Sequence, residues 1–121
     1  MQNLAFVMAA AALTLSAVAP GSATAGESAR ITAGRALAHD FAKGNCLACH
    51  AAPTDPAAQT LANIAPPLVM MRERFPDRGA LREQIGDARV RNPGTIMPPF
   101  AGHQILTDEE IELIIDYLYT L

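Results

Sequence analysis

The residues with the most distinctive chemistry in this 121-residue chain lie together at positions 46–50, in the order Cys-Leu-Ala-Cys-His. Two thiols at this spacing can each add to one vinyl group of a porphyrin, and the adjacent imidazole then lies beneath the ring as an iron ligand. CxxCH is the attachment signature of a c-type haem. We therefore expect Cys46 and Cys49 to hold one covalent haem c, with His50 as the proximal ligand of its iron.

Two other uses of these residues have to be weighed. A redox-active CxxC pair of the thioredoxin type belongs in a βαβ pattern, and the sequence has no such pattern. A zinc site needs four ligands, and beyond the motif only His39 and His103 remain to supply one. The spacing and its context favour haem over both alternatives.

A second chemically informative stretch is residues 92–100, Asn-Pro-Gly-Thr-Ile-Met-Pro-Pro-Phe. Its three prolines and one glycine exclude regular helix and hold Met97 in a rigid loop. A thioether is a soft, neutral donor suited to haem iron, and a Met/His ligand pair raises the reduction potential towards electron-transfer values. We predict Met97 as the distal ligand of the iron.

Four other residues and an open site compete with Met97 for the sixth position of the iron. These residues are Met70, Met71, His39 and His103. The two methionines are expected on an apolar helix face, where filling gaps is the ordinary role of methionine. His103 is the more serious rival, because it lies close to Met97 in the sequence.

The proline pair at 66–67 follows a loop-like stretch over residues 51–65 that is rich in Ala, Pro, Thr and Asp. A histidine that binds a metal almost always donates its second ring N–H to a carbonyl or carboxylate oxygen. A proline carbonyl suits this role, because proline has no N–H and a fixed φ. We predict that the carbonyl of Pro66 accepts from His50, with Pro67 as second choice; the pair could instead only stiffen the start of a helix.

Helical spacing predicts four helices, over residues 28–42, 68–75, 78–89 and from 107 to the end. Thr32 is the expected N-cap of the first helix, whose Leu37 and Phe41 share an apolar face, and its small residues would allow a close crossing with another helix. The last helix starts with a capping box at Thr107 and should pack on the first. No strand signal is comparable in strength, so the expected fold is all-α, with three to five helices around one haem.

Charged residues are numerous between positions 72 and 89 and are best explained as a solvated helix face. Some arginines of this region could instead reach the haem propionates, and the sequence does not choose among Arg72, Arg74, Arg78, Arg82 and Arg89.

The N-terminal region has the pattern of a secretory signal peptide over residues 1–25. An apolar run at residues 4–18 is followed by Ala-Thr-Ala, and cleavage is expected after Ala25. A retained membrane anchor is the competing interpretation, but the run is short for a full span. Residues 26–121 would then form one exported domain, stabilised by its covalent haem. The formal charge of −3 lies wholly in that domain and argues against nucleic acid or an anionic membrane as partner.

The order of the haem motif, the methionine loop and the terminal helix resembles class I cytochromes c over residues 32–121. A closer resemblance is to the SoxX family, the small monohaem subunits of the SoxAX cytochromes of bacterial sulfur oxidation. Its segments in this chain are residues 44–50, 66–68, 74–78, 81–82, 85, 87–88, 92–93, 97–100, 105–107 and 117–121. The chain departs from the family at Ala65, because a glycine usually precedes the two prolines there.

The resemblance implies a periplasmic heterodimer with SoxA, which joins thiosulfate sulfur to a cysteine of the carrier SoxYZ and releases two electrons. In that L-cysteine S-thiosulfotransferase the SoxX haem passes electrons to a downstream acceptor. If the roles known in that family apply to the matching residues here, Cys46 and Cys49 hold the porphyrin, His50 is the proximal iron ligand and Met97 is the distal iron ligand. The chain would then be a non-catalytic electron-transfer subunit, because both axial positions are filled.

Two alternatives to this role remain open. A free carrier between respiratory complexes would have a ring of charge around the haem edge, whereas residues 97–100 are apolar and fit a lasting interface. A ligand-binding or sensor haem protein would need an open sixth position on the iron.

Overall fold

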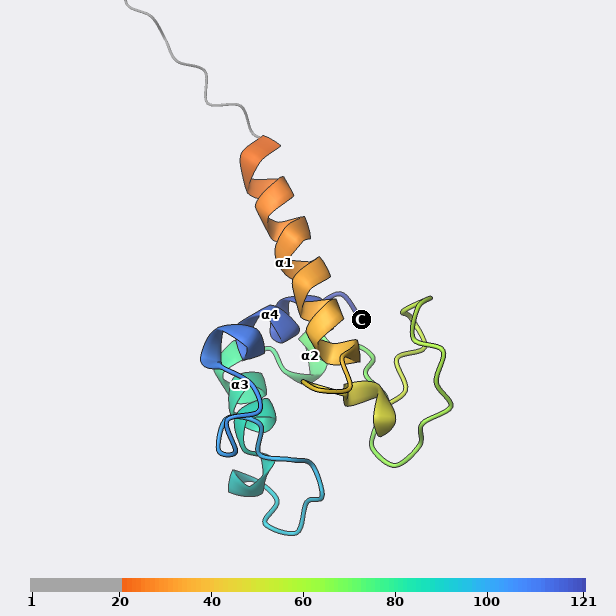
Figure 1. Ribbon diagram of the computed structural model, residues 1–121, viewed down its shortest axis with the longest axis vertical. Helices are drawn as coiled ribbons and strands as arrows, with labels where there is room; N and C mark the ends of the chain where they lie inside the picture. Colours follow the sequence, from red (N-terminus) through yellow and green to blue (C-terminus); the bar gives the residue numbers. More distant parts are fainter. Residues whose placement is uncertain (1–20) are drawn as a thin grey trace, which may run out of the picture.

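The computed structural model describes residues 21–121, which contain four α-helices, two short 3-10 helices and no strand. In chain order the helices are α1 (Gly21–His39), η1 (Cys46–Ala48), α2 (Met71–Arg74), α3 (Arg78–Gly86), η2 (Ala88–Val90) and α4 (Asp108–Leu118) (Figure 1). The all-α prediction and the expected number of helices are confirmed for this part of the chain.

Helix α4 starts as the capping box predicts. The hydroxyl of Thr107 accepts from the backbone N–H of Glu110 at 3.2 Å, and the Glu110 carboxylate accepts from the N–H of Thr107 at 2.9 Å. The Glu110 carboxylate also pairs with Lys43 at 2.7 Å, which joins the start of α4 to the segment just before the cysteine motif. The buried face of the helix consists of Ile111, Ile114, Ile115, Tyr117 and Leu118.

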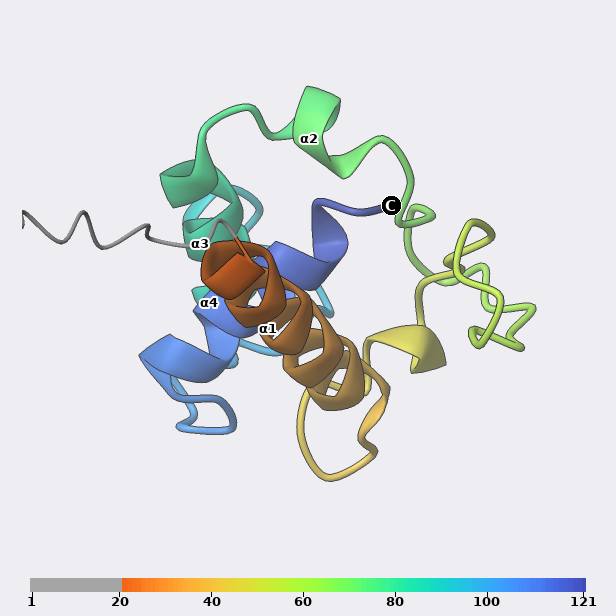
Figure 2. The same cartoon turned by 90° about the horizontal axis from the view of Figure 1, so that it is seen from above.

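Helix α1 lies across α4, as Figures 1 and 2 show from two directions. The crossing point is Gly34, where an added Cβ would overlap the carbonyl oxygen of Leu113. Ala38, one turn further along, is completely buried. The close crossing that the small residues predict is therefore present, and it needs a residue without a side chain at position 34.

The predicted limits of the first helix are wrong at both ends. Helix α1 already includes residues 21–25, and Thr32 lies inside it, where its hydroxyl donates to the carbonyl of Ser28 at 2.9 Å instead of capping. The helix ends at His39 because the Asp40 carboxylate accepts from the N–H of Ala42 and turns the chain. Phe41 consequently lies beyond the helix with 89% of its surface exposed, outside the core.

The apolar run at residues 4–18, on which the signal-peptide prediction depends, lies outside the described residues. Among the described helices, none has the length and apolar character needed to cross a membrane.

The segment between the proline pair and α3 is less helical than predicted. Helix α2 has only four residues, and Met70 precedes it in a left-handed conformation (φ 51°) with 62% of its surface exposed. Met70 therefore does not share an apolar helix face with the buried Met71. Asp77 caps α3 by accepting from the N–H of Gly79 at 2.8 Å. The predicted inward residues of this region, Leu81, Ile85 and Ala88, are buried.

The loop over residues 51–65 is fixed to the two crossed helices by one buried carboxylate, that of Asp55. It accepts hydrogen bonds from the hydroxyl of Tyr117 on α4 at 2.6 Å and from the guanidinium of Arg35 on α1. The N–H of Ala57 donates at 2.9 Å, and Nε2 of His39 lies 3.2 Å away. Sequence reasoning missed this cluster, because its members are far apart in the chain.

The cluster changes the acidity of Asp55. Burial by itself raises the pKa of this carboxyl group, but hydrogen bonds from Tyr117, Arg35 and the backbone of Ala57 outweigh burial and lower the pKa from 3.8 to about 2. Burial and the hydrogen bond to Asp55 raise the pKa of Tyr117, so its phenol stays protonated and continues to donate. The ionised carboxylate is thus the form that stabilises the fold.

We predict that Gly34→Ala lowers the free energy of unfolding by about 2–3 kcal/mol, because the new methyl group must push the two helices apart. Thermal unfolding of both proteins measures the difference. Gly26→Ala is the matched control, because it lies in the same helix with open space around the added Cβ. Equal destabilisation by the two variants would contradict the close crossing.

We predict that Tyr117→Phe lowers the free energy of unfolding by about 1–2 kcal/mol at neutral pH, since the carboxylate of Asp55 loses a donor. A carboxyl group with a depressed pKa stabilises the fold above its ordinary pKa of 3.8 and loses that contribution as the pH falls towards about 2. The difference between the two proteins should therefore shrink over this range. Denaturant unfolding at several pH values tests this.

Tyr119→Phe is the control for this experiment, because its hydroxyl donates to the neutral carbonyl of Phe75 at 2.9 Å. Its destabilisation should not vary with pH between neutrality and about 2. A constant effect of Tyr117→Phe over the same range would show that Asp55 is not the group responsible.

Candidate haem site

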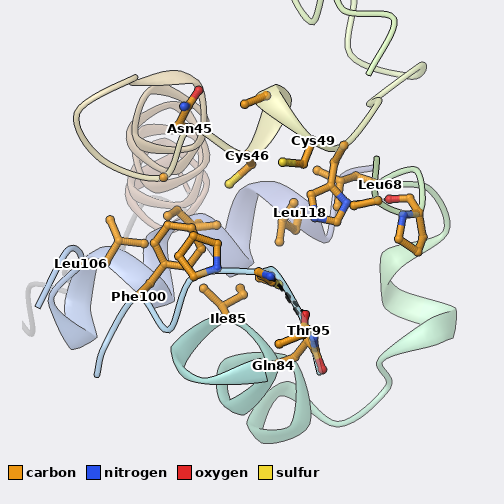
Figure 3. Close-up of a pocket in the computed structure, with 18 of the residues that line it drawn as sticks. Asn45, Cys46, Cys49, Leu68, Gln84, Ile85, Thr95, Phe100, Leu106 and Leu118 are labelled. Atoms are coloured by element: carbon orange, nitrogen blue, oxygen red, sulfur yellow. Dashed lines mark hydrogen bonds between the residues drawn. The ribbon is translucent and has the colours of Figure 1, made fainter. Parts of the chain in front are cut away.

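A cavity of about 780 Å³ lies between the cysteine motif, α3, the loop of Met97 and the end of α4. Its walls are mainly apolar and include Leu68, Ile85, Phe100, Leu106 and Leu118, which Figure 3 shows around one space. These side chains come from segments spread over most of the domain. The cavity is therefore created by the tertiary fold and suits a large, flat, apolar group.

Both cysteines lie in the wall of this cavity. Asn45 adopts a left-handed conformation (φ 45°) and turns the chain into η1, which carries Cys46 at its start. The N–H groups of Cys49 and His50 both donate to the carbonyl of Cys46, at 3.2 and 2.9 Å. Neither cysteine forms a disulfide, and Figure 3 shows both sulfur atoms turned towards the cavity. Two free thiols thus face the same space.

The chemical environment of Cys46 argues against a nucleophilic or redox-active role. Burial raises the pKa of its thiol to about 11, so the group is not a thiolate at neutral pH. Within the described residues there is no strand for a βαβ unit, and no cluster of three or more His, Cys, Asp or Glu side chains that could hold a metal ion. Neither His39 nor His103 lines the cavity. The thioredoxin and zinc interpretations therefore gain no support.

The imidazole of His50 is oriented by the proline segment. Its Nδ1 atom lies 2.6 Å from the carbonyl oxygen of Pro66, the acceptor that we expected from the sequence. A carbonyl oxygen can only accept, so Nδ1 carries a proton, and in the neutral imidazole this leaves the lone pair of Nε2 for a metal. The carbonyl of Pro67 has a different partner and accepts from Arg74 at 2.8 Å.

Met97 lines the cavity from the proline-rich loop and is partly buried. The backbone N–H of Met97 donates to the hydroxyl of Thr95 at 3.1 Å. Three of the four rival residues lie elsewhere: His39 belongs to the Asp55 cluster, while His103 and Met70 are exposed. Met71 does line the cavity, so both Met71 and Met97 bring a thioether to it.

Among the five arginines that the sequence left as alternatives, only Arg74 lines the cavity. Its guanidinium donates to the carbonyls of Pro67 and Val69 and has no carboxylate partner in the part of the chain that the structure describes. The other four have partners elsewhere: Arg72 stacks on Tyr119, Arg78 pairs with Glu112 and Asp116, Arg82 with Asp108 and Glu112, and Arg89 with Asp87.

This set of groups fits a c-type haem. Two free thiols match the two vinyl groups, an imidazole with a free Nε2 and a thioether match the two axial positions of the iron, and apolar walls match the porphyrin ring. An uncompensated guanidinium in the wall is available for a carboxylate of the ring.

Comparison with known proteins agrees with this geometry. The chain is similar to the crystal structure of SoxXA from P. pantotrophus, with 28% sequence identity and a TM-score of 0.66, over 74% of this chain and 79% of the other. Among curated proteins no match was found. The resemblance to SoxX and the cytochrome c fold that the sequence predicts are confirmed.

A family model described as cytochrome C oxidase, cbb3-type, subunit III, matches residues 30–118 and so includes the cysteine motif, the methionine loop and all of α4. With this match over most of its length, the chain belongs to that family of cytochromes c.

Proposed function

We propose that this chain is a periplasmic monohaem cytochrome that works as the electron-transfer subunit of a SoxAX-type complex. In this role it pairs with SoxA and accepts the electrons released when thiosulfate is joined to a cysteine of SoxYZ. The observation that carries the proposal is the donor set around one apolar cavity: Cys46, Cys49, His50 and Met97. The similarity to SoxXA supports the choice of partner.

When bound, the haem supplies a one-electron iron couple that accepts and releases electrons. Cys46 and Cys49 would hold the ring covalently, and His50 and Met97 would bind its iron, which would leave no position for a substrate. The hydrogen bond from His50 to Pro66 fixes the imidazole and makes it a stronger donor. The apolar walls of the cavity would exclude water from the bound group, which would limit reorganisation during electron transfer.

In this proposal no group of the cavity is left for acid–base or covalent catalysis, because the amine of Lys43, which lines it, is paired with Glu110 at 2.7 Å. Its described lining contains no Asp or Glu, and Nδ1 of His50 already donates to Pro66. The two thiols are used for attachment in this proposal. The bond-forming chemistry therefore belongs to the partner, and this chain carries the electrons away.

The surface beside the cavity also suits a lasting partner, although it differs from the segment expected. Pro99 and Phe100 are buried in the core, so residues 97–100 do not form an exposed apolar face. Phe41, Ile64 and Ile96 line the cavity instead, with 89%, 61% and 79% of their surfaces exposed. An apolar rim favours a stable interface over the charged, transient docking of a free carrier.

The function is tested by purifying the tagged chain from cells grown on thiosulfate and staining the co-eluting proteins for haem. We expect a stoichiometric haem-bearing partner, and reduction of the haem when thiosulfate and SoxYZ are added. Intact mass should correspond to residues 26–121 plus one haem, which also tests export and cleavage after Ala25. A chain that elutes alone and responds only to general reductants would instead be a free carrier.

We predict that Arg74→Leu lowers the reduction potential of the haem by some tens of millivolts. A cation near the ring favours the reduced state, which carries one negative charge more, and its loss removes that attraction. Potentiometric titration measures the shift. The reduction potential of Arg74→Lys should stay close to that of the unchanged protein. That of Arg82→Leu should do so too, because the guanidinium of Arg82 is already paired with Asp108 and Glu112. An equal shift in both leucine variants would exclude a specific contact.

A further inference from the structure

We propose that Gln84 is a positioning residue for Met97, and that its side-chain amide decides where the thioether sulfur lies in the cavity. Nε2 of Gln84 donates to Sδ of Met97 at 3.8 Å, within the range of a hydrogen bond to sulfur. The proposal rests on the proposed function, in which Met97 is the distal ligand.

Helix α3 holds Gln84 in a fixed place. Asp77 caps the start of the helix, and the N–H of Asp87 donates to the carbonyl of Glu83 at 2.8 Å at its end. Ile85, the next residue, is buried in the core, while Glu83 on the other side is exposed and pairs with Arg91. Gln84 itself lines the cavity, so its amide reaches Met97 from a rigid support.

The amide of Gln84 has no other hydrogen-bond partner among the described residues. Its interaction with the sulfur is therefore not a by-product of some other contact. At the backbone, Met97 is held by the hydroxyl of Thr95 and by the rigid Pro98 that follows. These restraints do not reach the sulfur, because a methionine side chain has three rotatable bonds. The Gln84 amide supplies the missing restraint.

The interaction also has an electronic consequence. Sulfur of a thioether can accept a hydrogen bond with one lone pair and bind a soft metal with another. Donation from Gln84 draws electron density from the sulfur, which favours the reduced iron over the oxidised iron. Gln84 would therefore both hold the sixth ligand in place and raise the reduction potential.

The test compares Gln84→Leu and Gln84→Glu with the unchanged haem-loaded protein. An ionised glutamate keeps the size of glutamine but cannot donate, so it removes the hydrogen bond without leaving a cavity. In the oxidised state, both variants should bind added imidazole about three- to tenfold more tightly, because displacing Met97 no longer breaks this bond. Both should also have a lower reduction potential.

Glu83→Gln is the matched control, since it changes charge on the same helix at a position that faces away from the cavity. Its imidazole affinity should equal that of the unchanged protein. An unchanged affinity and potential in both Gln84 variants would overturn the proposed role of Gln84.

Met97→Ala separates this result from a failure of the proposed function. We expect it to abolish the long-wavelength charge-transfer band that a thioether ligand gives to oxidised haem. If Met97→Ala changes the spectrum while both Gln84 variants keep the imidazole affinity and the reduction potential of the unchanged protein, only the positioning role is wrong. If Met97→Ala leaves the spectrum unchanged, Met97 is not the ligand and both proposals fall.

Discussion

The crossing of α1 over α4 at Gly34 is the contact on which the rest of this small domain depends. Because no side chain separates the helices there, Arg35 of α1 and Tyr117 of α4 can bind the same Asp55 carboxylate, and His39 of α1 lies beside Tyr117. A wider crossing would separate these three side chains. It would also open the cavity wall that Leu118 and Ile114 provide at the end of α4.

Asp55 connects the two crossed helices to the loop that leads to the site. Its carboxylate is bound by both helices at once, so the loop that carries it has a fixed path between the cysteine motif and the proline pair. Backbone hydrogen bonds complete the connection, from the N–H of Ala65 to Cys49 and from that of Leu68 to Ala51. The carbonyl of Pro66 is thereby brought to His50, and the orientation of the imidazole depends on contacts of Arg35, before it in the chain, and of Tyr117, far after it.

The two sides of the cavity are supported in different ways. On the side of His50, two hydrogen bonds hold the proline pair, one from the imidazole to the carbonyl of Pro66 and one from Arg74 to the carbonyl of Pro67. On the side of Met97, a proline-rich loop carries the thioether and the single amide of Gln84 reaches its sulfur. This second support comes from a helix and so does not depend on the loop itself. The arrangement suits electron transfer, which requires both axial ligands to stay in place as the iron changes its charge.

The elements whose signals are local could be predicted from the amino-acid order alone. The CxxCH spacing predicts covalent haem attachment, the capping box specifies the start of α4, and three prolines exclude helix around Met97. Each of these signals depends on residues within a few positions of one another. For the same reason the helical content and the inward face of α4 were predictable.

The packing of the helices was needed to show which distant residues act together. It places Asp55 beside Tyr117 and Gln84 beside Met97. It also shows that, of the five arginines that the sequence left as candidates, Arg74 is the one that lines the cavity. It also placed Phe41 outside the core, although its spacing matched an apolar helix face, because Asp40 turns the chain first. Periodicity predicts which face of an element is apolar, but not where that element ends or which side chain of another element meets it, because these depend on how the helices cross.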